Sequence, residues 1–258
     1  MTPGGTADRW AGRLGITRGF LLYTGPGGSA VSHSHYAIQL AWSDTAPITL
    51  ERTNDTITAD TVLIPSRQPH ALHTSADQMT ILFVDPRSRA GRTLSRAAAA
   101  TPISELVERM PSRVVPIGGW PEPAHTWIDR FATALDPDNE PENAGESSAE
   151  VEAAIAFIAA TLPDVPRLTD AATAVGVSPD RLRRVFRAGA GLPFRQFVLW
   201  ERLRLAVRAV QRGANLTDAA ATAGFSDSAH LSRVFKATFG LSPSSVLPGV
   251  TIIGPPTR

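Results

Sequence analysis

The 258-residue sequence contains no cysteine. This absence excludes disulfide bonds, zinc–thiolate sites and a cysteine nucleophile, and it fits a reducing compartment. Long apolar runs are also missing. The most apolar segment, residues 153–162, is much shorter than the roughly 20 residues that cross a bilayer, and no signal-peptide pattern precedes it. The sequence therefore predicts a soluble, cytoplasmic protein without a membrane partner.

Lysine is nearly absent, because Lys236 is the only one, and the basic character comes from arginine. The net charge of +1 is unevenly distributed. Residues 1–135 hold 12 Arg and 11 acidic residues, residues 136–163 hold seven acidic residues and no basic one, and residues 164–257 hold 11 Arg and Lys236 against six acidic residues. A basic C-terminal third that follows an acidic spacer is typical of a domain that binds a polyanion.

The C-terminal third contains an internal repeat. The segment LTDAA begins at Leu168 and again at Leu216, and each copy leads into a second apolar pattern. Further positions recur at an offset of 49: Leu182 and Leu231, Phe186 and Phe235, Gly191 and Gly240. Two units that share their apolar spacing and differ by one residue in a turn indicate a duplicated helix-turn-helix.

The first unit predicts an arginine-rich recognition helix. Ser178 is expected to cap this helix and Pro179 to occupy its first position, with the helix running to about Ala188. The residues expected to face outward are Asp180, Arg181, Arg183, Arg184 and Arg187. Guanidinium groups bind phosphates and guanine edges, so these residues are predicted to contact DNA. The alternative is a solvated basic face without a partner.

The second unit predicts a recognition helix over about Ser228–Thr238, capped by Ser226 or Asp227. Its outward residues are expected to be Ser228, Ala229, Ser232, Arg233 and Lys236. This surface carries less charge than the first. We therefore expect the first helix to supply more of the charge-driven affinity, and the second to contact bases through Arg233 and Ala229.

Four more helices complete the predicted DNA-binding part. The first runs through residues 151–162, with Ser147 or Ser148 as its expected cap and Pro163 at its end. A short helix precedes each recognition helix, and the expected N-caps are Thr169 or Asp170 and Thr217 or Asp218. Between the units, residues 194–212 form an unbroken amphipathic pattern. At 1.5 Å per residue this helix spans about 27 Å, which is compatible with placing the recognition helices near the ~34 Å repeat of the major groove.

The N-terminal part predicts an antiparallel β domain. Short runs rich in Val, Ile, Leu, Thr and aromatic residues are separated by turn residues: 19–25, 36–42, 47–51, 60–65 and 79–85. Closure into a small barrel removes the sheet edges. Beyond Pro86 the apolar residues are three and four apart, which predicts amphipathic helices.

Histidines are concentrated in the predicted β domain. His33 and His35 are two residues apart and on a strand share one face, with Gln39 further along it. His70 follows a turn, and Trp42 is a further candidate. We expect these five residues to line a ligand pocket, in which imidazoles orient a polar ligand. The alternative is an interior filled by its own side chains.

The segments HSHYAIQL, DTVLIPSRQPHAL and LFVDP resemble the cupin-type sensor domain of AraC-family regulators. In enzymatic cupins, two histidines, an acid and a later histidine bind a metal, so the resemblance makes His33, His35 and His70 metal candidates. Gln39 stands at about the place of the acid, and an amide is a poor substitute for a carboxylate on a hard divalent ion. We therefore expect no resident cofactor, with a divalent metal as the open alternative.

The segment GFSDSAHLSRVFKATFGLSP resembles the signature of the AraC/XylS family, and the resemblance covers about residues 165–247. It implies a transcriptional regulator that binds promoter DNA, responds to a small-molecule effector, forms a homodimer and contacts RNA polymerase. Val246 departs from the family pattern, because an aromatic residue is usual there. No catalytic residue is predicted. The alternatives are a metal-dependent cupin enzyme with an appended DNA-binding domain, and a regulator whose barrel binds no ligand.

The predicted fold class is α+β with two domains. Residues 1–100 are expected to form a cupin-like antiparallel β-barrel, and residues 101–135 a helical region that dimerises or packs on its own barrel. Residues 136–150 are expected to be an acidic linker. Residues 151–250 are expected to form an all-α double helix-turn-helix domain.

Overall fold

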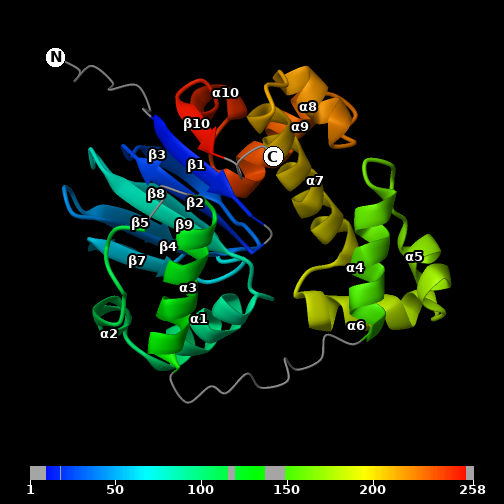
Figure 1. Ribbon diagram of the computed structural model, residues 1–258, viewed down its shortest axis with the longest axis horizontal. Coiled ribbons are helices and arrows are strands. Elements are labelled where there is room, and N and C mark those ends of the chain that lie inside the picture. The colour runs from blue at the N-terminus through cyan, green and yellow to red at the C-terminus, as the bar shows by residue number, and fades with distance from the viewer. Residues whose placement is uncertain (1–9, 18, 116–119, 137–148, 254–258) are drawn as a thin grey trace. The chain divides into compact units, whose positions relative to one another are not determined.

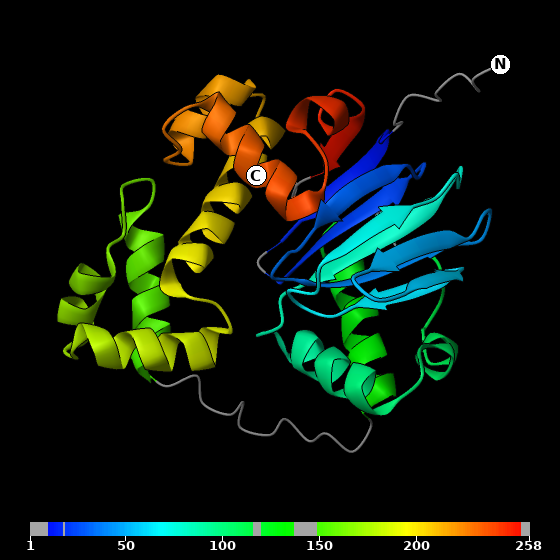
Figure 2. The same ribbon diagram turned by 180° about the vertical axis from the view of Figure 1, so that it is seen from behind.

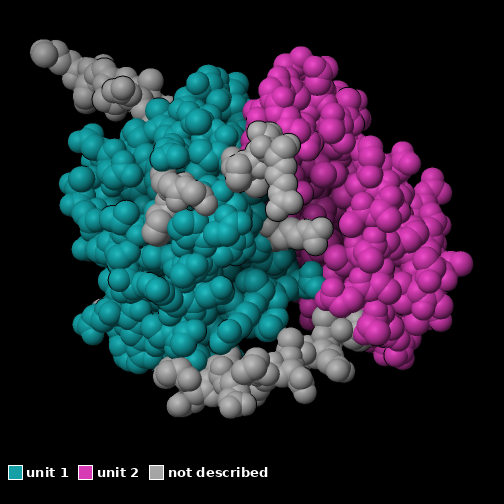
Figure 3. All heavy atoms as spheres, in the orientation of Figure 1, with its two compact units in different colours: residues 1–138, 235–258 teal, residues 139–234 magenta. Residues whose placement is uncertain are grey.

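The computed structural model describes residues 10–17, 19–115, 120–136 and 149–253. The chain divides into two units, which have different colours in Figure 3. The first unit comprises residues 1–138 and 235–258, and the second comprises residues 139–234. The boundary at residue 235 falls inside helix α9 (Ser228–Phe239), so the end of this helix belongs with the N-terminal strands.

Strands dominate the start of the first unit. Among the described residues up to Val84, the strands are β1 (Gly12–Ile16), β2 (Phe20–Gly25), β3 (Ser29–His33), β4 (Ile38–Ser43), β5 (Ile48–Arg52), β6 (Thr56–Ala59), β7 (Thr61–Ile64), β8 (His70–His73) and β9 (Met79–Val84). The five runs expected from the sequence correspond to β2, β4, β5, β7 and β9. The remaining strands, β1, β3, β6 and β8, do not correspond to any expected run.

The strands form two sheets. One has the order β10-β1-β2-β9-β4-β7, where β10 is Val250–Ile253, and the other has the order β3-β8-β5-β6. Pairing is antiparallel throughout, except between β1 and β10. The predicted fold class is confirmed, although the strands form two packed sheets rather than one closed barrel.

The two sheets enclose an apolar core. Alternate residues of β4 and β9 point to opposite faces of the larger sheet, as the two-residue period of a strand requires. Ala41 and Ile81 face the smaller sheet and pack with Ile48, Leu50 and Leu72 of that sheet. Side chains on this inner face therefore lie between two layers of strands.

Helices α1 (Arg89–Ala100), α2 (Ile103–Glu108) and α3 (Glu122–Leu135) cover the outer face of the larger sheet, as Figures 1 and 2 show. The apolar side of α3 buries Trp127, Ile128 and Phe131. These residues pack in one cluster with Leu40 and Trp42 of β4. The expected apolar stripe of residues 125–135 is thus covered by its own sheet.

Strand β10 was not predicted. It lies beyond the second helix-turn-helix in the sequence and pairs in parallel with β1, with Gly12 opposite Val250 and Gly15 opposite Ile253. Figure 1 shows the red β10 beside the blue β1. Val250 is buried in the core between the sheets. A pairing between such distant segments leaves no local signal in the sequence.

The second unit consists of helices. These are α4 (Ala149–Thr161), α5 (Leu168–Val175), α6 (Pro179–Ala190), α7 (Phe194–Gln211), α8 (Leu216–Thr222) and the first part of α9. A short helix, α10 (Pro243–Val246), follows α9 in the sequence. The expected order of two helix-turn-helix units joined by one long helix is present.

Local signals account for most helix ends in this unit. Gly176 ends α5 with a φ of 79°, which favours glycine. Asn215, not the expected Thr217 or Asp218, caps α8, because its side chain accepts the N–H of Asp218. Helix α5 begins one to two residues before the expected Thr169 or Asp170. The predicted acidic linker lies outside the described residues, except Asp136 and the start of α4.

Hydropathy gives no sign of a transmembrane helix. None of the helices in the described ranges is both long enough and apolar enough to span a bilayer.

Candidate nucleic-acid interface and histidine site

Helix α6 is the expected recognition helix of the first helix-turn-helix. Ser178 caps it by accepting a hydrogen bond from the N–H of Arg181 at 3.3 Å, and Pro179 is its first residue, as the sequence predicts. Leu182 and Phe186 are fully buried and fix which side faces the core. The outward residues are exposed as expected: Asp180, Arg181, Arg183, Arg184 and Arg187.

Four of these residues form one face of α6, because positions 180, 183, 184 and 187 are three and four residues apart. Arg183 donates a hydrogen bond to the carboxylate of Asp180. Within the described part of the chain, Arg184 and Arg187 make no hydrogen bond or ion pair. Their guanidinium groups are available for phosphates or base edges.

Arg181 lies beside this face rather than on it. Its guanidinium group forms an ion pair with Glu150 of α4 at 2.8 Å. The pair joins α6 to the first turn of α4. Arg181 therefore has a structural partner that Arg184 and Arg187 lack.

Helix α9 is the expected recognition helix of the second helix-turn-helix. Asp227 caps it, because its carboxylate accepts the N–H of His230 at 2.6 Å, and this hydrogen bond lowers the pKa of Asp227. Ala229, Arg233 and Lys236 are exposed, as the sequence predicts. Ser228 and Ser232 are half-buried, and the hydroxyl of Ser232 donates to the carbonyl of Ser228 at 2.8 Å.

A buried arginine that the sequence analysis missed joins the parts of the second unit. Arg202 of α7 is 8% exposed and donates to the carbonyl of Asp164 at 3.0 Å. Burial lowers the pKa of Arg202. Gly224, in the turn between α8 and α9, lies next to its guanidinium group. The long helix α7 thus holds the loop before α5 close to the turn between α8 and α9.

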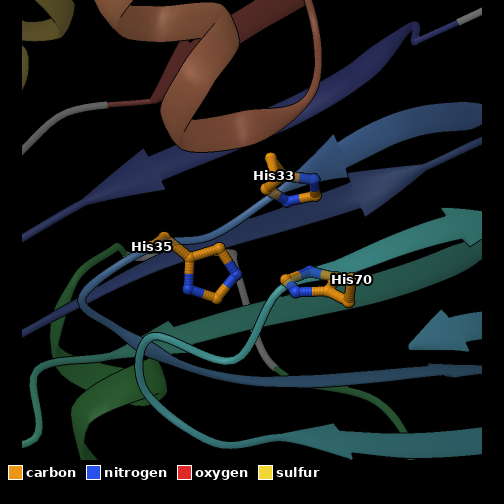
Figure 4. Close-up of side chains that lie close together, drawn as sticks. All are labelled: His33, His35 and His70. Atoms are coloured by element: carbon orange, nitrogen blue, oxygen red, sulfur yellow. The ribbon is translucent and has the colours of Figure 1, made fainter. Parts of the chain in front are cut away.

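The three histidines predicted to share a pocket converge between the two sheets of the first unit (Figure 4). His33 ends β3, His70 begins β8, and the two pair across the smaller sheet. His35 lies in the loop between β3 and β4. The ring centroids are 4.2 to 5.6 Å apart, and the nitrogen atoms that can bind a metal all lie within 4.8 Å of one another.

Hydrogen bonds fix which nitrogen of each ring carries the proton. The Nδ1 atoms of His33, His35 and His70 each lie 2.8 Å from a backbone carbonyl oxygen, that of Val31, Ala37 and Gln68 respectively. A carbonyl only accepts, so Nδ1 donates and Nε2 keeps its lone pair. The Nε2 atom of His70 is buried and has no partner among the described residues.

Burial keeps these rings neutral. It lowers the pKa of His33 to about 4 and that of His35 to about 3, and the neighbouring His70 adds to both shifts. Burial also lowers the pKa of His70. Neutral imidazoles that keep an Nε2 lone pair are the form that binds metal ions, and at His35 this lone pair faces the side-chain amide of Gln39.

Gln39 of β4 completes the cluster. Its side-chain amide lies 2.7 Å from Nε2 of His35, and Gln39 itself is buried. Because Nδ1 of His35 already donates to Ala37, Nε2 has no proton to give, and the contact is satisfied when the amide presents its NH₂ group. The predicted place of Gln39 beside the histidines is observed.

Trp42 does not lie with the histidines. It is three residues from Gln39 on the same strand, so it points to the opposite face, where it stacks on Trp127 at a centroid distance of 5.8 Å. Its indole N–H donates to the carbonyl of Arg113 at 2.6 Å. Trp42 borders a separate open hollow of about 210 Å³ near Ser43. Counting strand positions from Gln39 is sufficient to place it there.

Three residues at the histidine site were not predicted. Phe83 of β9 packs edge-on against His35 with centroids 5.0 Å apart. Phe239, the last residue of α9, packs against Phe83 at 5.9 Å. Gly240 accepts a hydrogen bond from the N–H of Val31 at 3.1 Å. No sequence motif links these residues with the histidines.

Comparison with known proteins places the C-terminal part in one class. Residues 171–248 match a family model described as "Helix-turn-helix domain". This part of the chain is similar to a helix-turn-helix domain. The chain is 35% identical over 99 residues to YidL of Escherichia coli strain K12, described as an uncharacterized HTH-type transcriptional regulator. The match covers 38% of this chain and 33% of the length of YidL.

Solved structures of ToxT share the fold of nearly the whole chain. ToxT from Vibrio cholerae O395 is 14% identical, with a TM-score of 0.56 over 91% of this chain and 99% of its own. ToxT from strain SCE256 with a bound unsaturated fatty acid is 13% identical, with a TM-score of 0.54 over 90% of this chain and 95% of its own. The chain therefore has the fold of ToxT.

Proposed function

We propose that the protein is a transcriptional regulator that binds promoter DNA through α6 and α9 and is controlled by a ligand in its N-terminal domain. The observation that carries the proposal is the duplicated helix-turn-helix, in which α6 exposes Arg183, Arg184 and Arg187 on one face. Arginine on a recognition helix binds guanine edges and phosphates. Such a regulator acts in the cytoplasm, where it meets DNA and RNA polymerase.

The histidine site is the proposed place of the ligand. The ToxT structure with a bound unsaturated fatty acid is an example of this fold with a small-molecule ligand. In this chain, His33, His35 and His70 supply three convergent nitrogen atoms between the sheets, and Gln39 supplies an amide. Trp42 is not part of the proposed site, because it lies on the other face of β4.

The residues of this site fit a transition metal ion. Three neutral imidazoles point toward one centre, each held by a hydrogen bond from Nδ1 to a carbonyl, which is the usual support of a metal-binding histidine. Imidazole suits zinc, copper, iron and nickel better than magnesium or calcium. His33, His35 and His70 would hold the ion, and the ion would supply a positive charge that attracts an anionic effector.

A metal-dependent cupin enzyme is the competing function. The potential ligand cluster consists of three histidines, and the described residues near it offer Gln39 where a carboxylate is expected. Among the described residues, no carboxylate lies beside the proposed metal, and the three imidazoles would hold the ion rather than act as general acids or bases. The relative YidL is named as a transcriptional regulator, and we propose that this protein is not an enzyme.

DNA binding tests the proposal directly. Fragments bound by the protein are first selected from genomic DNA, and one of them is used in gel shifts. Arg184→Ala is expected to weaken specific binding by about 1 to 3 kcal/mol. The control is Arg130→Ala, which removes an exposed arginine from α3. Equal affinities of the wild type and Arg184→Ala would exclude α6 as a DNA-contacting helix.

A homodimer on paired half-sites is part of the proposal. The apolar side of α3 packs on its own sheet, so a dimer contact in residues 101–135 has to use the exposed side of these helices. Sedimentation of the protein with DNA that carries one or two half-sites measures the stoichiometry. A single copy on a complete operator would contradict the dimer.

A further inference from the structure

The end of α9 lies at the histidine site of the first unit. Gly240, directly after α9, accepts the N–H of Val31 at 3.1 Å, and Val31 accepts the Nδ1 proton of His33 at 2.8 Å. A Cβ atom on Gly240 would lie 2.6 Å from Nδ1 of His33 and would overlap the carbonyl oxygen of Val31. Gly240 also has a φ of 71°, which favours glycine. The backbone after α9 therefore packs directly on one of the three histidines.

A second contact runs through aromatic rings. Phe239 packs on Phe83 with centroids 5.9 Å apart, and Phe83 packs on His35 with centroids 5.0 Å apart. The three rings form a continuous series from the histidine site to the last residue of α9. Two of the three histidines, His33 and His35, are thus connected to the same end of α9 by separate contacts.

The chain beyond α9 is also held in the first unit. After α10, Gly249 accepts the N–H of Gly12 at 3.1 Å, and β10 then pairs with β1. The segment between Phe239 and Val250 is fixed at both ends. A shift of Gly240 is therefore transmitted to α9 rather than absorbed by a loose chain end.

Helix α9 carries predicted DNA contacts at its other end. Ala229, Arg233 and Lys236 are exposed on the same helix that ends at Phe239. The α9 helix has no proline or glycine between Ser228 and Phe239. An unbroken helix moves as one body, so a displacement at Phe239 changes the position of Arg233.

We infer that the C-terminal end of α9 senses whether His33, His35 and His70 hold a transition metal ion. The contacts of Gly240 with His33 and of Phe239 with Phe83 make the connection, and metal binding thereby changes the affinity for DNA. The inference rests on the proposed function, because it assigns the ligand class and the regulation of the same site. The Nε2 atoms of His33, His35 and His70 would hold the ion, and two of these rings, those of His33 and His35, are connected to the end of α9.

Linkage makes the inference quantitative. If zinc changes the affinity for DNA by some factor, DNA must change the affinity for zinc by the same factor. Couplings between sites usually correspond to factors of about 5 to 150. We expect Zn²⁺ added to metal-free, full-length protein to change the Kd for DNA by at least about fivefold. We also expect it to change amide hydrogen exchange in residues 235–241 without DNA.

Phe83→Leu tests the aromatic contact without altering the helix-turn-helix. The zinc affinity of this variant is measured separately, and DNA binding is compared without zinc and at saturating zinc. Phe83→Leu is expected to retain zinc-free DNA binding but to reduce the zinc-induced change in DNA affinity toward onefold. Phe20→Leu is the matched control, because Phe20 lies on the outer face of the same sheet, against Trp120. The control is expected to keep the full zinc effect.

Gly240→Ala tests the backbone contact and is paired with Gly213→Ala. Gly213 has a φ of 92°, so alanine is strained there too, but its Cβ meets nothing within 4 Å. We expect Gly240→Ala, and not Gly213→Ala, to lose the zinc effect. If Gly240→Ala fails to fold, Phe83→Leu and the hydrogen exchange of the wild type still test whether α9 responds to zinc.

The outcomes separate the inference from the proposed function. An equal zinc effect in the wild type and Phe83→Leu overturns the inference. Failure of the wild type to bind zinc also overturns the inference. The same holds if zinc still binds after His33, His35 and His70 are all replaced by alanine. In each case, specific DNA binding that depends on Arg184 leaves the proposed regulator intact. If the wild type binds no DNA specifically, either with or without zinc, the proposed function is overturned instead.

Discussion

Burial determines the charge of the histidine cluster at the scale of single residues. His33, His35 and His70 are each less than 9% exposed, and the pKa of each is lowered. Their protons are held on Nδ1 by backbone carbonyls, so no ring needs a second proton for its hydrogen bonds. The cluster is therefore neutral, and its protonation would lower the free energy of unfolding.

This burial predicts a loss of stability in weak acid. The pKa of His35 is about 3 in the folded protein and 6.5 ordinarily, so the unfolded chain takes up a proton that the folded chain does not as the pH falls below 6.5. The free energy of unfolding should fall by about 1.4 kcal/mol per pH unit for this histidine. Urea unfolding of chelator-treated protein at pH 7 and pH 5 measures the change.

His35→Gln is expected to reduce this pH dependence, while His73→Gln, at a half-exposed position outside the cluster, is expected to leave it unchanged. An unaltered dependence in His35→Gln would show that His35 titrates normally in the folded protein.

A single glycine in the second unit gives another residue-scale prediction. Gly224 has a φ of 75°, and a Cβ there would overlap the carbonyl oxygen of Pro163. Gly224→Ala should therefore destabilise the second unit by more than the 1 to 2 kcal/mol that a left-handed alanine costs on its own. Thermal unfolding compares it with Gly213→Ala, which has open space. Equal midpoints would contradict the predicted overlap.

Short-range signals were predictable at this scale. The serine cap of α6 follows from the preference of a single position, and Ser178 was placed correctly. Asn215 was missed because three possible capping residues lie close together there. Phe83 and Gly240 were missed because their contacts with the histidines depend on the packing of distant segments.

The recognition helices differ at the scale of secondary-structure elements. Helix α6 exposes Arg184 and Arg187 without partners among the described residues, whereas α9 exposes Arg233, Lys236 and the small Ala229. Charged contacts with phosphates set the salt dependence of binding, and contacts with base edges set the sequence preference. The two helices should therefore respond differently to mutation.

We expect replacement of both Arg184 and Arg187 by alanine to lower the slope of log K against log salt by about 2, one for each lost phosphate contact. Ala229→Gln is expected to leave the slope unchanged and to alter the preferred bases. Fluorescence anisotropy over a range of salt concentrations, with selection of bound sequences, measures both. The assignment of roles fails if Ala229→Gln changes the slope as much as the double variant.

Elements defined by periodic patterns were predictable, and those defined by partners were not. Helix α7 was expected over 194–212 and ends at Gln211, because its apolar spacing continues without a breaker. Strand β10 has only four residues, Val250–Ile253, and its place in the sheet depends on its pairing with β1. The division of the strands into two sheets likewise depends on pairings between strands far apart in the chain.

The charge distribution belongs to the scale of the whole molecule. Residues 136–150 carry six acidic groups and no basic one, and the C-terminal part is basic. Among the described residues of this segment, Asp136 pairs with Arg96 at 2.9 Å and Glu150 pairs with Arg181 of α6 at 2.8 Å. The acidic groups are expected to compete with DNA phosphates for the basic part.

Replacing these six acids by their amides is expected to raise DNA affinity at low ionic strength, where the Debye length is about 30 Å at 0.01 M, and to have little effect at 1 M. Glu108→Gln with Glu122→Gln, both exposed on the helices of the first unit, is the control. Unchanged affinity at low salt would contradict competition by this segment.

The pairing of β10 with β1 also sets an order of events during protein synthesis. The first strand of the larger sheet emerges from the ribosome early, but its outer edge can be covered only after residue 253 has been made. Until then β1 exposes unpaired backbone groups, which promote aggregation. A ribosome that stalls within the helix-turn-helix region therefore leaves behind an N-terminal domain whose larger sheet is one strand short, and such fragments should depend on chaperones more than the finished chain does.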